Sequence, residues 1–125
     1  MSSVPTPTHA ELTLLNLLWK RGPSTVHNLI DAMPARAIGY TTVLKTLQIM
    51  DAKGLVGRDS SRRPHVFEAA IEQTATQRSM VGRLADRAFQ GSIASLVLNA
   101  LGSGRSSKAE LAEIRAMLDR LAGDD

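Results

Sequence analysis

The sequence predicts a mainly α-helical chain that contains one small β-hairpin. Apolar residues recur at helical spacing in six separate stretches, which are bounded by residues that start or stop helices. Residues 55–59 and 65–69 instead have the composition of short strands, and the basic segment 60–64 joins them. They follow the third helical stretch, so we expect a hairpin with a basic tip. Three helices and then a hairpin is the order of a helix-turn-helix domain with a β-wing.

The first two helices have recognisable start and stop signals. Thr8 and Glu11 have the spacing of a capping box, which opens a helix that should end at residues 21–23. Ser24 or Thr25 should cap the second helix, and Pro34 should end it. The expected apolar positions are Leu12, Leu15, Leu18 and Trp19 in the first helix, and Val26, Leu29, Ile30 and Met33 in the second.

The third helix, predicted over residues 40–53, has a polar face of an unusual kind. Two sets of positions are spaced i, i+4, i+7: Val43, Leu47 and Met50, and on the opposite side Thr41, Lys45 and Gln48. A surface helix usually carries Glu/Lys pairs on its polar side. Short hydroxyls, one cation and one amide instead suit a major groove, because they reach phosphates and base edges without filling the space. The pattern predicts a recognition helix, although a solvated amphipathic helix has the same apolar spacing.

In the second strand, alternation predicts that His65, Phe67 and Ala69 face one way and that Val66 and Glu68 face the other. The hairpin tip carries Arg62 and Arg63. Positive charge is concentrated in this half of the chain: residues 1–70 hold eight Lys/Arg against five Asp/Glu, whereas residues 71–125 hold seven against seven. The excess therefore lies with the predicted recognition helix and wing.

Composition narrows the classes of protein to consider. The chain has 125 residues and no cysteine, which excludes disulfides, cysteine zinc sites and thiol catalysis. Its apolar runs are too short to cross a bilayer, and its first residues lack the features of a signal peptide. We therefore expect a cytoplasmic protein without membrane insertion. His9, His27 and His65 fall in separate elements and no catalytic motif is present, so we predict neither an enzyme nor a cofactor or metal.

From residue 71 onward the pattern is helical only. We expect a winged-helix DNA-binding domain at 1–70 and a helical dimerisation domain at 71–125, with breaks at 91–92 and 102–104 and a capping box at Ser107 and Glu110. Three thin helices cannot bury so many apolar side chains alone. They either fold back on the first domain or pair with a second copy, and the contrast between the halves favours a homodimer. The expected interface residues are Val81, Leu84, Ala88, Ile93, Leu96, Val97, Leu101, Leu111, Ile114, Leu118 and Leu121.

Five segments resemble the penicillinase-repressor family of bacterial transcription regulators, which includes β-lactamase and methicillin-resistance repressors and copper-transport relatives. They are Leu17-Leu18-Trp19, residues 22–26, residues 40–43 with Leu47, residues 53–56, and residues 95–99. The likeness keeps its order over nearly the whole chain. It implies a homodimeric winged-helix repressor that binds a palindromic operator in double-stranded DNA. A ligand-responsive repressor of another winged-helix family fits the segments at residues 18–19 and 40–43 less well.

The resemblance and the helix pattern together give the DNA-binding candidates: Ser24, Thr25, Tyr40, Thr41, Thr42, Lys45, Thr46, Gln48, Arg62, Arg63 and His65. Hydroxyls and helix-start amides would hold phosphates, Lys45 would reach guanine acceptors, and Gln48 would reach adenine. Leu44 would either contact a thymine methyl or pack inside. The wing arginines would contact the backbone or a minor groove.

The chain departs from the family pattern at several positions. Ile49 stands where many relatives carry Arg, and Arg62-Arg63 replaces a commoner Gly-Arg. Phe67 and Ala69 stand where Tyr and Pro are frequent. The Ile49 difference leaves the operator sequence open. A winged-helix module that binds protein rather than DNA is the remaining alternative, but such modules usually lack a basic wing and carry acidic residues on the third helix.

The resemblance also implies a route of inactivation. In β-lactam-responsive members, a membrane sensor protease system triggers cleavage just after an Asn in the dimerisation region. The matching bond here is Asn99–Ala100, where a bulky aromatic residue would be expected in place of Ala100. The other interpretation is that Asn99 is the solvent-facing polar position of an apolar helix. Copper-responsive relatives use C-terminal cysteines, so copper sensing is not expected here.

Overall fold

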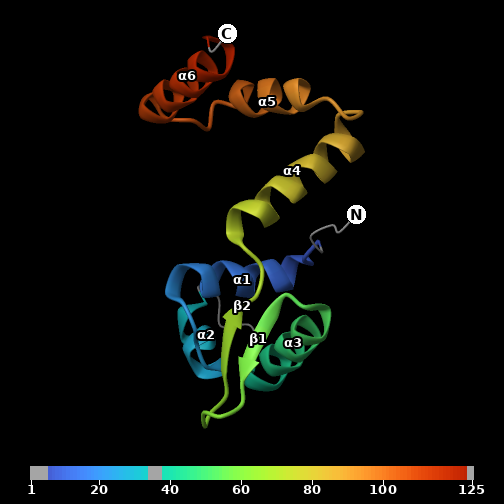
Figure 1. The fold of residues 1–125 in the computed structure, drawn as a ribbon, viewed down its shortest axis with the longest axis vertical. Coiled ribbons are helices and arrows are strands. Elements are labelled where there is room, and N and C mark those ends of the chain that lie inside the picture. Colours follow the sequence, from blue (N-terminus) through green and yellow to red (C-terminus); the bar gives the residue numbers. More distant parts are fainter. Residues whose placement is uncertain (1–5, 34–37, 124–125) are drawn as a thin grey trace. The chain divides into compact units, whose positions relative to one another are not determined.

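The computed structural model describes residues 6–33 and 38–123, and within these ranges it contains six helices and one two-stranded sheet (Figure 1). In chain order they are α1 His9–Arg21, α2 Val26–Ala32, α3 Tyr40–Lys53, β1 Val56–Asp59, β2 Val66–Ala69, α4 Gln73–Ala88, α5 Ile93–Gly102 and α6 Lys108–Gly123. The predicted fold class is confirmed. The predicted stop at Pro34 lies outside the described residues, and α2 ends at Ala32 with Met33 as its C-cap.

The chain divides into two compact units, which we call the N-terminal unit (Met1–Val81) and the C-terminal unit (Gly82–Asp125). The N-terminal unit contains the first three helices, the hairpin and the start of α4. The C-terminal unit contains the rest of α4 with α5 and α6. The division thus falls inside α4, later than the change of sequence pattern at residue 70.

The helix starts follow the side-chain signals in the sequence. The Thr8 hydroxyl accepts from the backbone N–H of Glu11 at 3.2 Å, and the Glu11 carboxylate accepts from the Thr8 N–H at 2.9 Å, which completes the predicted capping box. The predicted box at Ser107 and Glu110 is present as well. At α2 the capping residue is Thr25, because its hydroxyl accepts from the N–H of Asn28 at 3.1 Å.

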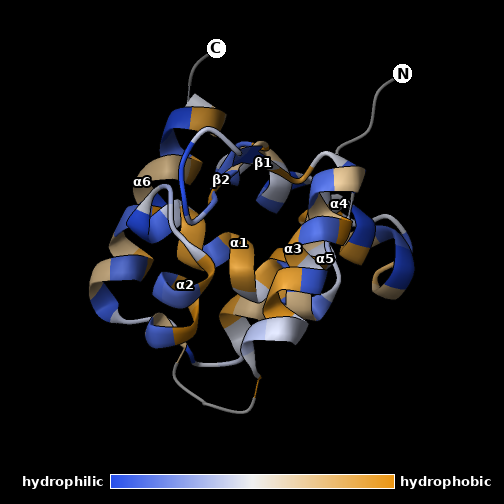
Figure 2. Cartoon of the chain, turned by 90° about the horizontal axis from the view of Figure 1, so that it is seen from below, coloured by the Kyte–Doolittle hydropathy of each residue, from blue (hydrophilic) through white to orange (hydrophobic). Residues whose placement is uncertain are grey.

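The core of the N-terminal unit is built around the apolar face of α3. The side chains of Val43, Leu47 and Met50 are at most 1% exposed, as their spacing predicted. They belong to one cluster with residues of α1, α2 and the hairpin, including Leu15 and Phe67. Figure 2 shows apolar and polar residues mixed along these helices, as expected when one side of each is buried. Gly54 ends α3 in the left-handed conformation, with φ of 83°, which a residue with a Cβ rarely adopts.

The hairpin is antiparallel, with Val56 opposite Ala69 and Asp59 opposite Val66 (Figure 1). Phe67 also pairs with Ser24 through two backbone hydrogen bonds of 2.8 and 2.9 Å, which ties the α1–α2 loop to β2. Val66 is buried as well as Phe67, although the expected alternation of β2 sets these two side chains on opposite faces. Adjacent residues of a strand point to opposite faces, so both faces of the hairpin are covered at this point.

A buried carboxylate joins α1 to the end of α3. Glu11 is 3% exposed, and its Oε2 lies 2.7 Å from Nζ of Lys53 while Oε1 completes the capping box. Burial acts to raise the pKa of Glu11. The hydrogen bonds from Lys53 and Thr8 outweigh that effect and hold the pKa below its ordinary value of 4.5. The ionised carboxylate therefore stabilises the fold above that value.

Replacing this carboxylate should change how stability depends on pH. Because the pKa is lowered in the folded chain, the contribution of Glu11 is lost as pH falls through the lowered value. Glu11→Gln should cost about 1–3 kcal/mol at pH 7 and should lose less further stability than the parent between about pH 5 and pH 3. Urea titrations at one protein concentration would measure both effects. Glu68→Gln, at an exposed position of the same unit, is the control, and equal pH profiles for Glu11→Gln and the parent chain would contradict the assignment.

The C-terminal unit leaves most of its apolar side chains on the surface. In the described part of the chain, α5 and α6 contain no buried residue. Leu98 and Leu121 are each 69% exposed, and Leu118 is 53% exposed. Across the described ranges, no helix is both long and apolar enough to span a bilayer.

Candidate nucleic-acid interface

One strip of α3 is exposed along the length of the helix. It consists of Thr41, Lys45, Gln48 and Ala52, which are spaced i, i+4, i+7, i+11 and lie opposite the buried face of α3. We call these four residues the α3 strip. Three of them were predicted, whereas Ala52 was not. A small last residue at this end leaves room for another surface to approach the polar side chains. The strip carries one positive charge and no acidic residue.

Four other predicted residues of α3 lie outside the strip. Tyr40, which is 41% exposed, places its ring against that of His27 on α2, with centroids 4.8 Å apart. Thr46 is half-buried and its hydroxyl donates to the carbonyl of Thr42 at 2.9 Å. Leu44 is half-buried and packs against the core, in agreement with the packing alternative. Thr42 itself is exposed beside the strip.

The two candidates before α2 have structural partners. Ser24 is 4% exposed, and its hydroxyl donates to the carbonyl of Gly22 at 2.9 Å. Its side chain is therefore not on the surface with the α3 strip. Thr25 is half-buried and uses its hydroxyl as the cap of α2. Both hydroxyls are therefore engaged in hydrogen bonds within the fold.

The two arginines at the hairpin tip have different surroundings. Arg63 is exposed, and its guanidinium donates to the carbonyl of Ser60 and contacts Nε2 of His65, both at 2.8 Å. It therefore braces the tip as well as adding charge. Arg62 is exposed and lies close enough to Asp59 to contribute to a lowered pKa of that carboxyl, behind the larger effect of hydrogen bonds from Ser61. Arg62 is the more available wing cation.

A third wing cation was missed from the sequence. Arg58 on β1 is exposed and lies directly opposite Phe67 in the strand register. Residues opposite each other in an antiparallel pair project to the same face. Arg58 therefore lies on the same face of the hairpin as the buried Phe67. The available signal was the place of Arg58 within the predicted strand, two residues after Val56 and therefore on the same face. It places a cation at the edge of the core and on the same hairpin as the tip arginines.

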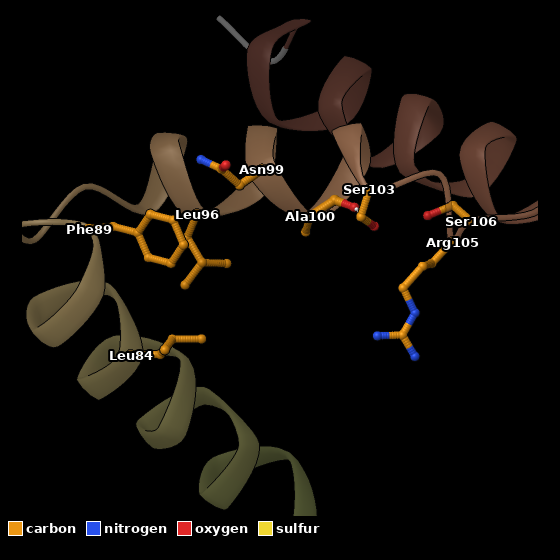
Figure 3. Close-up of a pocket in the computed structure, with 8 residues that line it drawn as sticks. All are labelled: Leu84, Phe89, Leu96, Asn99, Ala100, Ser103, Arg105 and Ser106. Carbon is orange, nitrogen blue, oxygen red and sulfur yellow. Dashed lines mark hydrogen bonds between the residues drawn. The ribbon is translucent and has the colours of Figure 1, made fainter.

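The predicted dimerisation residues lie in or next to the C-terminal unit, and none is fully buried. The exposed ones are Val81, Leu84, Ala88, Ile93, Val97, Leu111, Leu118 and Leu121, and the half-buried ones are Leu96, Leu101 and Ile114. Leu84, Leu96 and Phe89 converge on an open groove of about 510 Å³ within this unit (Figure 3). The groove continues past Ala100 to Arg105 on the loop before α6. Exposed apolar side chains that gather in this way often mark a face that another protein surface covers.

The Asn99–Ala100 bond lies inside α5, and both residues are exposed. The Asn99 amide donates to the carbonyl of Ser95 at 2.8 Å, one turn earlier. Both residues border the groove, with Ala100 on the side of Leu84 and Leu96 (Figure 3). The backbone at this bond is therefore helical, although the side chains of the two residues that it joins are accessible.

Within 6–33 and 38–123, no three or more His, Asp or Glu side chains come together as possible metal ligands. The chemistry available at the α3 strip and the wing is hydrogen bonding and charge attraction. That chemistry suits recognition of a surface with phosphates and polar edges.

The chain is similar in sequence to known proteins. The sequence model of the penicillinase repressor family matches residues 7–120. Methicillin resistance regulatory protein MecI from Staphylococcus aureus (strain N315) and from Mammaliicoccus sciuri are each 20% identical over 112 residues, which cover 89% of this chain and 91% of the relative.

Two solved structures were also found. One is a MarR family transcriptional regulator from Silicibacter pomeroyi DSS, with 21% identity and a TM-score of 0.45 over 96% of this chain and 69% of that chain. The other is Bordetella bronchiseptica BpsR, whose DNA binding is regulated by 6-hydroxynicotinic acid, with 19% identity and a TM-score of 0.45 over 96% and 84% of the two chains. The family match extends over most of the sequence. The chain therefore belongs to the penicillinase repressor family.

Proposed function

We propose that the chain is a homodimeric transcriptional repressor that binds a palindromic operator through the α3 strip and the basic wing. The observation that carries this proposal is the α3 strip: one cation, one amide and one hydroxyl, exposed on a helix whose other side is fixed in the core. Such a helix can enter a major groove without losing its support. The family is one of repressors and not of enzymes.

In this proposal the side chains divide into two groups by what they contact. Lys45 and Gln48 reach base edges, since a lysine suits the acceptors of guanine and a glutamine suits adenine. Thr41, Thr42 and the first amides of α2 and α3 contact phosphates and fix the register. Arg62 and the neighbouring wing cations add attraction that falls with salt.

The second part of the proposal is the homodimer. The apolar side chains that α5 and α6 leave exposed support it, because a single C-terminal unit does not bury them. Two copies would place two α3 helices in successive major grooves, roughly 34–36 Å apart or a multiple of that distance. A two-fold symmetric protein requires a two-fold symmetric operator.

The test is selection of bound sequences from a randomised DNA pool with the purified protein at moderate salt. We expect a two-fold symmetric motif whose half-sites are about one helical turn apart. A motif without symmetry would contradict the dimeric mode. A folded protein that enriches no sequence would contradict DNA recognition and favour the protein-interaction module.

Inactivation by proteolysis is the third part of the proposal. The Asn99–Ala100 bond lies in α5, so a protease that needs an extended substrate must first unwind this helix. Cutting there would separate α6 from the rest of the apolar surface and weaken the dimer. Mass spectrometry of the chain from cells treated with a β-lactam should find a fragment that ends at Asn99. Recovery of the intact chain alone, while repression is lifted, would contradict cleavage at this bond.

A further inference from the structure

Ile49 is an apolar residue on the exposed side of α3. Its side chain is 45% exposed, whereas Val43, Leu47 and Met50 on the other side of the helix are at most 1% exposed. The core is therefore filled without it. Single exposed isoleucines are ordinary on protein surfaces, so exposure alone says little. What matters is the position of this one.

Helical spacing places Ile49 along the edge of the α3 strip. It lies four residues after Lys45 and three before Ala52, so it adjoins both on the helix surface. Thr42 lies seven residues earlier on the same side and is exposed as well. A branched apolar group thus borders Lys45, the cation that the proposed function assigns to a base edge. When the strip enters a groove, Ile49 must enter with it.

Only one base presents an apolar group in the major groove, and that is thymine with its 5-methyl. We propose that Ile49 contacts the 5-methyl group of a thymine in each operator half-site and so helps to determine sequence specificity. This inference rests on the proposed DNA-binding function. A polar base edge against Ile49 would lose water without gaining a hydrogen bond, so the contact selects against the other bases as well as for thymine.

The side chain is suited to this role by its stiffness. A β-branched residue in a helix has one strongly preferred χ1 rotamer, so Ile49 offers its methyl groups at a defined place with little loss of entropy on binding. Gln48, which suits adenine, lies on the other edge of the α3 strip and does not adjoin Ile49.

The experiment uses the full chain and the operator obtained by selection. Each thymine of one half-site is replaced in turn by deoxyuridine, which removes the 5-methyl and keeps the pairing edge. For the parent chain we expect one position at which the replacement weakens binding about four-fold, the effect of burying one methyl-sized group. Ile49→Ala should bind the thymine operator more weakly by a similar factor and should no longer distinguish deoxyuridine at that position.

Two further measurements serve as controls. Ile49→Val retains a branched apolar side chain and should restore most of the discrimination, while circular dichroism should show that both variants fold like the parent. A parent chain that tolerates deoxyuridine at every position, or an Ile49→Ala chain that keeps the parent's sensitivity, would overturn this inference and leave DNA binding intact. Failure of the parent chain to bind any selected DNA would instead overturn the proposed function.

Discussion

Leu118→Asp is expected to leave a folded chain that no longer dimerises and that binds its operator at least about 100-fold more weakly than the parent. Leu118 lies on α6, is 53% exposed, and belongs to the apolar side chains for which a second copy is the proposed partner. A charge there would be buried without a counter-charge in the dimer, which is costly. In the monomer the same charge stays in water.

The loss of DNA affinity follows from linkage between the two subunits. In a dimer, binding of one α3 helix holds the second close to its half-site, so the second contact forms at a high effective concentration. A monomer loses this advantage although its α3 strip is unchanged. The effect should therefore appear on the full palindrome and should be small on an isolated half-site. Removing a base contact would instead weaken binding to the full palindrome and to the isolated half-site.

The control is Ala116→Asp, which adds the same charge at an exposed position elsewhere on α6. Sedimentation should show a dimer for this variant and a monomer for Leu118→Asp. Leu96→Asp changes a half-buried residue of α5 that lines the groove and should behave like Leu118→Asp. A folded monomer that keeps the operator affinity of the parent would contradict the role given to the C-terminal unit.

Local sequence signals were sufficient to predict most of the fold. The capping boxes at Thr8 and Ser107 and the stop at Gly54 depend on residues within a few positions of one another. The buried face of α3 follows from helical spacing alone. Such features arise from neighbouring backbone groups, and for this reason a single sequence contains them.

Contacts between distant residues could not be predicted in the same way. The ion pair of Glu11 with Lys53 joins residues 42 positions apart, and Ser24 is withdrawn from the surface because its backbone pairs with β2. Periodicity gives no information on either contact. Arg63 was expected to contact DNA, and its contacts with Ser60 and His65, which depend on the path of the hairpin tip, were not predicted. The candidate site was therefore predicted best where it lies on one helix.

Lys45→Ala is expected to relax sequence preference. If Lys45 donates to guanine acceptors, the variant should lose about 1–3 kcal/mol at the selected operator and much less on random DNA. Arg62→Ala should instead weaken both kinds of DNA to a similar degree and reduce the slope of log affinity against log salt by about one. Fluorescence anisotropy with both DNAs, at several salt concentrations, would measure the two quantities. Lys20→Ala, at an exposed lysine in the last turn of α1, is the control.

The comparison of these two cations separates base recognition from charge attraction. Each substitution removes one positive charge, so a purely electrostatic role would give both variants the same salt dependence and the same loss on every sequence. Lys45 differs in its position, because it stands in the middle of the α3 strip between Thr41 and Gln48, whereas Arg62 stands at a hairpin tip. A base-reading lysine should lose its effect when the guanine that it contacts is replaced. If Lys45→Ala loses the same affinity for operator and for random DNA, base recognition by Lys45 is contradicted. Lys45 would then contact phosphates.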